Sequence, residues 1–338
     1  MKVSELGEFG LIELLAEIAT KARGKALLVD IGDDAAAWRT KAAIQLATTD
    51  ALIQDVHFTL STITWRELGW KALAVNLSDI AAMGGAPQYA LVSLGLPGDT
   101  EVEHVAQLYE GMVELTQRYD VAIAGGNIVA APLVVLSLAV IGTAKGNILT
   151  RSAAAPGDQI AVTGYLGTSG AGLAMLKKGL QFDDETTTYL REAHLKPHPR
   201  IAEGQILASN GVKAAIDLSD GLVSDLAKVC KASRVGAHLR VEKIPIHPLV
   251  SAAFKQDCLN LALSGGEDYE LLFTGRVEVM DRVKGLMPCP ISVIGEIVNK
   301  EPGRVRLLNE QGKEIGVERG GWEHFAPRNE SGLSKPGY

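Results

Sequence analysis

The sequence has few cysteines, few aromatic residues and no cluster of basic residues. Its three cysteines, Cys230, Cys258 and Cys289, are far apart and form no CxxC pair, which argues against a disulfide framework and a zinc site. Unpaired cysteines are typical of a reducing compartment, so a cytoplasmic location is predicted. The formal net charge of −7 provides no basic surface for nucleic acid, and we expect no nucleic-acid partner.

Patterns of membrane proteins and of two nucleotide-binding folds are also missing. The longest apolar run, residues 130–144, is too short to span a bilayer, and the first residues lack a signal-peptide pattern, so no membrane partner is expected. No GxxxxGKS/T loop occurs, which excludes the P-loop NTPases. The glycines of residues 164–172 follow the order GxxGxxGxG rather than GxGxxG, which disfavours a dinucleotide site, although Asp183 and Asp184 follow at a suitable distance.

The composition and length indicate a globular protein with two domains. Hydrophobic residues make up 47% of the 338 residues, which is typical of a globular fold of class α/β (α+β). Because one core rarely serves so long a chain, we expect one domain over residues 1–147, a second over 148–327, and a flexible tail over 328–338.

The alternation of apolar runs and turn residues predicts the secondary structure. Strands are expected at 26–31, 44–49, 89–96, 121–124, 133–144, 159–163, 214–216, 270–273, 291–297 and 305–308. Helices are expected at 8–22, 65–83, 100–119 with Asp99 or Thr100 as its cap, 173–178, 222–232 and from Pro199 onward.

The apolar helix at 65–83 carries an aspartate that needs a partner. Burying a bare carboxylate costs several kcal/mol, and Lys71 lies two turns before Asp79 and about 80° around the helix. Acids also close two of the predicted strands, with Asp33 and Asp34 after the first and Asp50 after the second. Three acid-tipped elements suggest a shared cation, and hard oxygen ligands of this kind suit Mg²⁺.

The second half repeats this arrangement. Asp217, Ser219 and Asp220 precede a helix, where Ser219 or Asp220 could instead act as an N-cap. Glycine pairs precede Asn127 and Glu267, and backbone N–H groups beside paired glycines can approach phosphate. A polyphosphate carried by several Mg²⁺ ions would explain the acids, with Arg151 as the main protein cation. Phosphoryl transfer requires only positioning and charge neutralisation, so the lack of a Cys/His or Ser/His nucleophile set is no objection.

Together these motifs resemble the thiamine-monophosphate kinase family of the PurM-like superfamily, from residue 7 to about residue 326. The matching segments are GEFGLI at 7–12, IGDDAA at 31–36, TTD at 48–50, HF at 57–58, KALAVNLSDIAAMG at 71–84, LTRSAAAPGD at 149–158, IDLSDGL at 216–222 and ALSGGEDYEL at 262–271. The resemblance implies two α/β domains, a homodimer formed by pairing of the N-terminal sheets, and in-line transfer of the γ-phosphate of ATP to thiamine monophosphate, which gives thiamine diphosphate.

The resemblance also implies roles for individual residues. Ligands of several Mg²⁺ ions would be Asp33, Thr48, Thr49, Asp50, Asp79, Asn127, Asp217 and Asp220. Contacts to ATP would be Gly126, Asn127, Arg151, Ser219 and Tyr109, with Arg151 stabilising charge. Contacts to thiamine monophosphate would be His57, Glu267 and Trp322. The nucleophile would be the ionised phosphate of the substrate, so no catalytic base is expected.

One departure from the family pattern concerns Asn127. Many members have Asp there, followed by Thr-Thr-Arg-Gly, where this chain has Ile-Val-Ala-Ala at 128–131. An amide oxygen can ligate Mg²⁺ but adds no negative charge, so weaker binding of one ion is predicted. Two alternatives remain at this point, namely another PurM-like ATP-dependent kinase or synthetase, and a non-catalytic binder of nucleotide or thiamine phosphate.

Overall fold

The computed structural model describes residues 27–29, 32–40 and 43–316. The helix expected at 8–22, the tail expected at 328–338 and Trp322 lie outside these ranges. None of the helices within them is both long and apolar enough to cross a membrane.

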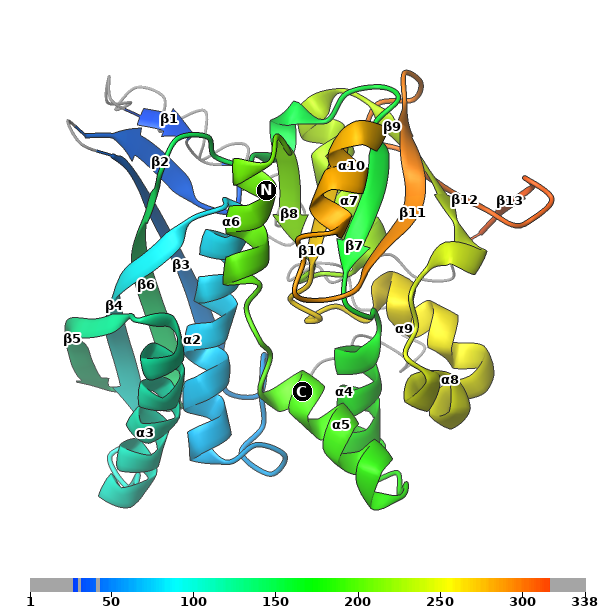
Figure 1. The fold of residues 1–338 in the computed structure, drawn as a ribbon. Helices are drawn as coiled ribbons and strands as arrows, with labels where there is room; N and C mark the ends of the chain where they lie inside the picture. The colour runs from blue at the N-terminus through cyan, green and yellow to red at the C-terminus, as the bar shows by residue number, and fades with distance from the viewer. Residues whose placement is uncertain (1–26, 30–31, 41–42, 317–338) are drawn as a thin grey trace, which may run out of the picture.

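The first half of the chain forms a six-stranded sheet (Figure 1). Its strands are β1 (Leu27–Val29), β2 (Ala36–Arg39), β3 (Ile44–Ile53), β4 (Ala86–Leu96), β5 (Ala122–Ala130) and β6 (Val135–Ala144), in the order β1-β2-β3-β6-β4-β5. Only the β4–β5 pair within this sheet is parallel. β3 is longer than expected, so Thr49 and Asp50 lie within the strand rather than at its end.

Two long helices belong to this half of the chain, α2 (Trp65–Ala82), which packs against the sheet, and α3 (Val102–Tyr119), which packs against α2. Thr64 and Glu67 form a capping box that starts α2. The helix is buried on nearly all sides, because the first sheet, α3 and α6 surround it. The cap expected for α3 is wrong, since its N-cap is Glu101 and no side chain caps it.

The second half forms a seven-stranded sheet with helices around it (Figure 1). The strands are β7 (Gln159–Thr163), β8 (Ala214–Asp217), β9 (Gly236–Arg240), β10 (Leu271–Gly275), β11 (Ile291–Val298), β12 (Val305–Leu308) and β13 (Glu314–Ile315), in the order β13-β12-β9-β11-β7-β10-β8. The helices are α4 (Thr168–Lys178), α5 (Asp184–Leu195), α6 (Ile201–Ser209), α7 (Leu222–Ser233), α8 (Pro248–Phe254), α9 (Cys258–Ser264) and α10 (Val277–Lys284), and the short 3-10 turn η2 (Arg151–Ala153) joins the halves.

The two halves share one hydrophobic core. The buried cluster around α2 also includes Ala161, Ala215 and Phe273 from the second sheet, while a separate cluster packs α7 against the other face of that sheet. Close helix contact supports this core, because a Cβ on Gly204 of α6 would lie 2.0 Å from the backbone oxygen of Ala81 in α2. The shared core fixes how the halves face each other.

The glycine-rich segment at 164–172 serves the fold. The carboxylate of Asp268 accepts hydrogen bonds from the backbone N–H groups of Gly167, at 2.7 Å, and Ser169, at 3.1 Å. The start of α4 is therefore occupied by a side chain of the protein itself. Asp183 caps α5 by accepting from the backbone of Thr186, so it has a structural role here. Both contacts agree with the expectation that this segment is not a dinucleotide site.

Candidate active site

A cleft of about 2300 Å³ lies between the two halves and gathers most of the residues singled out from the sequence. Its walls come from β3, α2, η2, the end of β8, α7 and the loop that contains Glu267. The expected site residues that line it are Asp33, Thr48, Thr49, Asp50, His57, Asp79, Arg151, Asp217, Ser219, Asp220 and Glu267.

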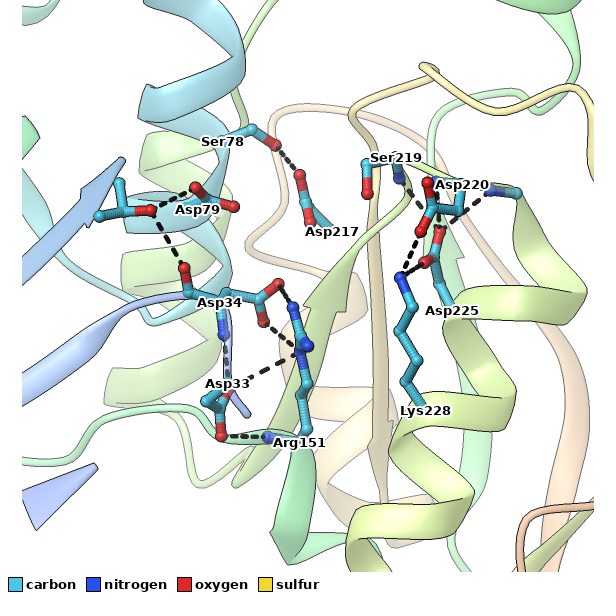
Figure 2. A network of polar contacts seen from close by, with 12 residues as sticks. Asp33, Asp34, Ser78, Asp79, Arg151, Asp217, Ser219, Asp220, Asp225 and Lys228 are labelled. Carbon is cyan, nitrogen blue, oxygen red and sulfur yellow. Dashed lines mark hydrogen bonds and ion pairs between the residues drawn. The ribbon is translucent and has the colours of Figure 1, made fainter. Parts of the chain in front are cut away.

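Three carboxylates from distant parts of the chain meet in this cleft (Figure 2). One oxygen each of Asp34, Asp79 and Asp217 lies within 4.8 Å of the others. Asp34 comes from the turn before β2, Asp79 from the last turns of α2, and Asp217 from the end of β8. Hard oxygen donors at this spacing match the ligand chemistry of Mg²⁺.

Hydroxyl groups of Thr48 and Ser78 orient two of these carboxylates. The Oγ1 of Thr48 on β3 donates to Oδ2 of Asp79 at 2.6 Å and to the backbone oxygen of Asp34 at 3.2 Å. The Oγ of Ser78 donates to Oδ2 of Asp217 at 2.7 Å. Hydrogen bonds to a carboxylate favour its charged form and fix its direction, so the group is organised before any ligand arrives.

The electrostatics of the cleft favour a cation. Burial, and then the negative charges of Asp50 and Asp217, raise the pKa of Asp79 well above its ordinary value of 3.8. Burial and the charge of Asp34 do the same for the pKa of Asp217. Desolvation of the Asp50 carboxylate, followed by the negative charges of Asp220 and Asp34, raises the pKa of Asp50 to about 6. A divalent ion would relieve this repulsion, so the donors present fit Mg²⁺.

Arg151 contacts both acids of the pair at 33–34. Its guanidinium bonds both carboxylate oxygens of Asp34, at 2.6 and 3.3 Å, a bidentate pair. Its backbone N–H donates to Oδ2 of Asp33 at 3.0 Å. The resemblance assigns a metal-ligand role to Asp33 and none to Asp34. In this structure Asp34 is the acid that lies beside Asp79 and Asp217. The two adjacent acids in IGDDAA were the available signal.

The loop at 217–221 is held by an acid that sequence reasoning missed. Asp225 is fully buried, and its Oδ2 accepts from the backbone N–H groups of Ser219, Asp220 and Gly221 at 3.0–3.1 Å (Figure 2). The N-cap role considered for Ser219 or Asp220 is wrong, because Gly221 is the N-cap and no side chain caps α7 from that position. Lys228 Nζ bridges Asp220, at 2.5 Å, and Asp225, at 2.8 Å.

The segment with Glu267 packs directly on that loop. The backbone N–H of Glu267 donates to the oxygen of Ser219 at 2.8 Å, and that of Tyr269 donates to the oxygen of Leu218 at 3.0 Å. Gly266 has φ +69°, and a Cβ there would lie 2.7 Å from the oxygen of Ser219. The glycine therefore permits a close backbone approach, which carries Glu267 to the cleft wall.

His57 also lines the cleft, just beyond β3. Its Nδ1 accepts a hydrogen bond from the backbone N–H of Ile53 at 3.1 Å, and the ring is half-buried. This contact fixes the ring and requires that Nδ1 carry no proton. Nε2 is therefore the nitrogen of the neutral ring that bears the proton.

Three of the expected ATP or metal contacts lie away from the residues that line the cleft. Gly126 and Asn127 are on β5, an edge strand. The sequence pattern predicts a loop after that strand for both residues, and this placement is wrong. A Cβ on Gly126 would lie 1.9 Å from the backbone oxygen of Val92, so strand pairing itself requires this glycine. Tyr109 lies on α3 and packs partly buried against the core. Their roles stay predictions, as does that of Trp322, which lies outside the described residues.

Asn127 shares one row of the first sheet with a residue of the cleft wall. Pairing across β5, β4, β6 and β3 places Asn127 opposite Ser93, Ser93 opposite Ser137, and Ser137 opposite Ala51. Directly paired residues point to the same face, and neighbouring strands are about 4.8 Å apart. Asn127 is therefore three strands, about 14 Å, from Ala51 and on the same face of the sheet.

Comparison with known proteins shows what the chain is similar to. Residues 32–144 match the N-terminal domain of AIR synthase related protein, and residues 155–307 match its C-terminal domain. Thiamine-monophosphate kinase of Escherichia coli (strain K12) is 39% identical over 329 residues, covering 95% of this chain and 98% of that protein. The enzyme of Bacillus subtilis (strain 168) is 38% identical over 310 residues, covering 88% and 93%.

Solved structures agree with these matches. AaThiL complexed with AMPPCP and TMP has a TM-score of 0.84 and 34% identity, over 96% of this chain and 99% of that one. The hydrogenase maturation protein HypE in complex with ATP has a TM-score of 0.69 at 16% identity, over 93% of this chain and 96% of that one, and shares the fold alone. The expected PurM-like fold is confirmed. With identities near 38% over most of its length, the chain belongs to the thiamine-monophosphate kinase family.

Proposed function

We propose that this protein transfers the γ-phosphate of ATP to thiamine monophosphate and so forms thiamine diphosphate. Its relatives are thiamine-monophosphate kinases, and one similar protein was solved with the ATP analogue AMPPCP and with TMP. The observation that carries the proposal is the meeting of Asp34, Asp79 and Asp217 in a cleft between the two halves. A cleft so rich in carboxylates needs cations before it can accept a triphosphate.

Mg²⁺ is the proposed cation. Asp34, Asp79 and Asp217 would hold one ion, and Asp33, Thr48, Asp50 and Asp220 line the same cleft as further oxygen donors. When bound, Mg²⁺ neutralises phosphate charge and polarises the transferred phosphoryl group. The fold prepares for this by directing the hydroxyl groups of Thr48 and Ser78 at two of the carboxylates.

Arg151 is the protein residue proposed to stabilise the negative charge of the transferred phosphoryl group. The guanidinium is only 19% exposed, and it lies in the cleft against Asp34. Because a guanidinium donates in a planar fork, the group that now bonds the two oxygens of Asp34 is also suited to two phosphate oxygens. The attacking oxygen belongs to the phosphate of thiamine monophosphate, which is ionised at neutral pH, so the protein need not remove a proton from it.

The substrate's thiamine part is assigned to the cleft walls at His57 and Glu267. The Glu267 carboxylate is 22% exposed and is a hydrogen-bond acceptor for an aminopyrimidine or a counter-charge for a thiazolium ring. His57 offers a ring whose orientation is already fixed by Ile53. Trp322 and a cytoplasmic location remain part of this proposal on sequence grounds.

A homodimer is also proposed, and the open face of the first sheet supports it. Tyr89 and Leu91 on β4 and Val129 on β5 lie on this face and are exposed, with exposed fractions of 42% to 53%. Pairing of two such faces would remove these apolar side chains from water. It would also enclose Asn127 and Gly126, and a nucleotide lying along this face would join them to the cleft.

The test is an assay of product with purified protein. ATP and thiamine monophosphate are incubated with and without Mg²⁺, and thiamine diphosphate and ADP are quantified by chromatography. We expect both products in equal amounts and only with the metal. Asp217→Asn should lower turnover at least a hundredfold, while Asp184→Asn on the exposed start of α5 should leave it unchanged. ADP formed only with another phosphate or carboxylate acceptor, or binding without turnover, would contradict the proposal.

A further inference from the structure

A lysine is buried on the same helix as Asp79 but serves a different carboxylate. Lys71 on α2 is 1% exposed, and its Nζ lies 2.9 Å from Oε1 of Glu267. A buried ammonium requires a counter-charge, because desolvation otherwise costs several kcal/mol. That counter-charge comes from the other half of the protein, so the ion pair crosses from the first half to the cleft wall of the second.

His194 completes the surroundings of this lysine. The ring, on α5, is 2% exposed, with Nε2 3.5 Å from Nζ of Lys71 and Nδ1 3.0 Å from Oγ of Ser169. An ammonium group only donates, so Nε2 must accept and the ring proton lies on Nδ1. Burial and the charge of Lys71 lower the pKa of His194 to about 3, which keeps the ring neutral. The Nδ1 atom also lies 3.6 Å from Oε2 of Glu267, so lysine and histidine flank its carboxylate.

Glu267 is fixed by its backbone as well as by this pair. Its φ is +57°, a left-handed conformation that is strained for a non-glycine residue and persists only where the surroundings impose it. The hydrogen bond from its N–H to the oxygen of Ser219 ties it to the loop that carries Asp220. The backbone therefore fixes the position of the Glu267 Cα atom, and the ion pair with Lys71 fixes the position of its carboxylate.

We propose that Lys71 is a positioning residue for substrate recognition, which holds the Glu267 carboxylate at the cleft wall together with neutral His194. The inference rests on the proposed function, since it assigns Glu267 to the thiamine part of the substrate. The ammonium group of Lys71 pairs with one oxygen of Glu267 at 2.9 Å, so the carboxylate is presented to the substrate in a fixed orientation as a hydrogen-bond acceptor. No contact between Lys71 and the nucleotide is required.

The experiment compares Lys71→Met, Lys71→Arg, Glu267→Gln and the Lys71→Met/Glu267→Gln double variant. We expect K71M to raise the KM for thiamine monophosphate about tenfold, with the KM for ATP within twofold of wild type. K71R keeps the charge but replaces a compact ammonium by a longer planar fork, so it should raise the same KM about threefold. The double variant should be no worse than E267Q, because Lys71 acts only through Glu267.

Arg200→Met is the matched control. Arg200 is another largely buried cation, and it pairs with Glu270, three residues after Glu267, outside the residues that line the cleft. R200M should lower the melting temperature without separating the two KM values. An unchanged KM for thiamine monophosphate in K71M or K71R, or equal rises in both KM values, would overturn the role of Lys71.

Binding measurements separate this inference from the proposed function. Titration calorimetry gives the Kd of thiamine monophosphate for the wild type and K71M in the absence of ATP. A wild type that makes no thiamine diphosphate counts against the proposed function alone. Equal Kd values for the wild type and K71M overturn the role of Lys71, whether or not turnover occurs.

Discussion

Ser78 on α2 donates a hydrogen bond of 2.7 Å from its Oγ to Oδ2 of Asp217 at the end of β8. A helix of the first half thus holds a carboxylate of the second half. The same helix contributes Asp79 to the acid group and directs Lys71 at Glu267. Lys71, Ser78 and Asp79 follow the spacing of one helix face, so a single face of α2 organises side chains from both halves.

Replacing Ser78 by alanine should weaken metal binding more than it weakens the fold. The hydroxyl is fully buried, and a hydrogen bond to a charged group contributes about 1.5–3 kcal/mol. We therefore expect the Mg²⁺ concentration for half-maximal activity to rise about tenfold in S78A, with kcat at saturating metal nearly unchanged. Mg²⁺ titrations of initial rate measure this shift.

The control for this variant is Thr274→Val. Thr274 is also a buried hydroxyl that donates to a carboxylate, Asp158, but it lies outside the residues that line the cleft. T274V should lose stability and keep the wild-type Mg²⁺ requirement. Equal metal requirements in S78A and the wild type would refute the role assigned to Ser78.

The acid group predicts how stability depends on pH. Burial, followed by the charge of Asp34, raises the pKa of Asp33 to about 6, and the pKa values of Asp79 and Asp217 are also raised. Because the folded state then binds more protons than the unfolded state between pH 4 and 6, these groups stabilise the fold at low pH and lose that contribution as pH rises through about 6. Without metal, the melting temperature should be several degrees higher at pH 5 than at pH 7.5.

Mg²⁺ should reverse this trend. A cation replaces protons between the carboxylates, so its stabilising effect should be larger at pH 7.5 than at pH 5. Thermal melts at both pH values, with and without Mg²⁺, test both the pH dependence of the metal-free protein and the larger effect of Mg²⁺ at pH 7.5. Asp217→Asn removes one of the repelling charges and should reduce both the pH dependence and the metal effect. Equal Mg²⁺ shifts at the two pH values would contradict the assignment.

Asp225 is expected to make a large contribution to the free energy of unfolding. Its carboxylate accepts three backbone hydrogen bonds and pairs with Lys228, so Asp225→Asn should lower the free energy of unfolding by about 2–4 kcal/mol. Lys228→Met leaves the three backbone bonds in place and should cost less. Denaturant unfolding measures both, and a D225N variant no less stable than K228M would show that the loop does not depend on this acid.

The sequence predicted most of the described strands and the long helices, but it missed β2, β9 and β13, the helices α5, α8, α9 and α10, and the contacts that hold the site loops. The run of apolar residues around Asp79 correctly predicted α2, because burial on all sides leaves a clear composition signal. The role of Asp225 could not be predicted, since an acid in the first turn of a helix is ordinarily read as a solvated side chain. Only the fold turns its carboxylate back onto the preceding loop.

Glycines and adjacent acids were the other source of error. The glycine pair at 125–126 is expected in a loop after a strand, whereas it lies within β5, beside a bulge and in close pairing with β4. The contact of Gly126 to ATP stays a prediction. Asp33 and Asp34 differ by one position, and spacing alone does not decide which carboxylate faces Asp79. That choice depends on Arg151, which comes from beyond the first sheet and binds both acids.

Asn127 provides a test of charge on the open face of the first sheet. It is exposed on β5 and lies in the sheet row that ends at Ala51, a residue of the cleft wall. If its amide oxygen ligates an ion, Asn127→Asp adds a full negative charge at that ligand and should lower the half-saturating Mg²⁺ concentration threefold to tenfold. N127A removes the oxygen and should raise it. Rate measurements across a Mg²⁺ series at fixed ATP distinguish the three proteins, and an identical half-saturation point in N127D and the wild type would show that no ion is bound at this position.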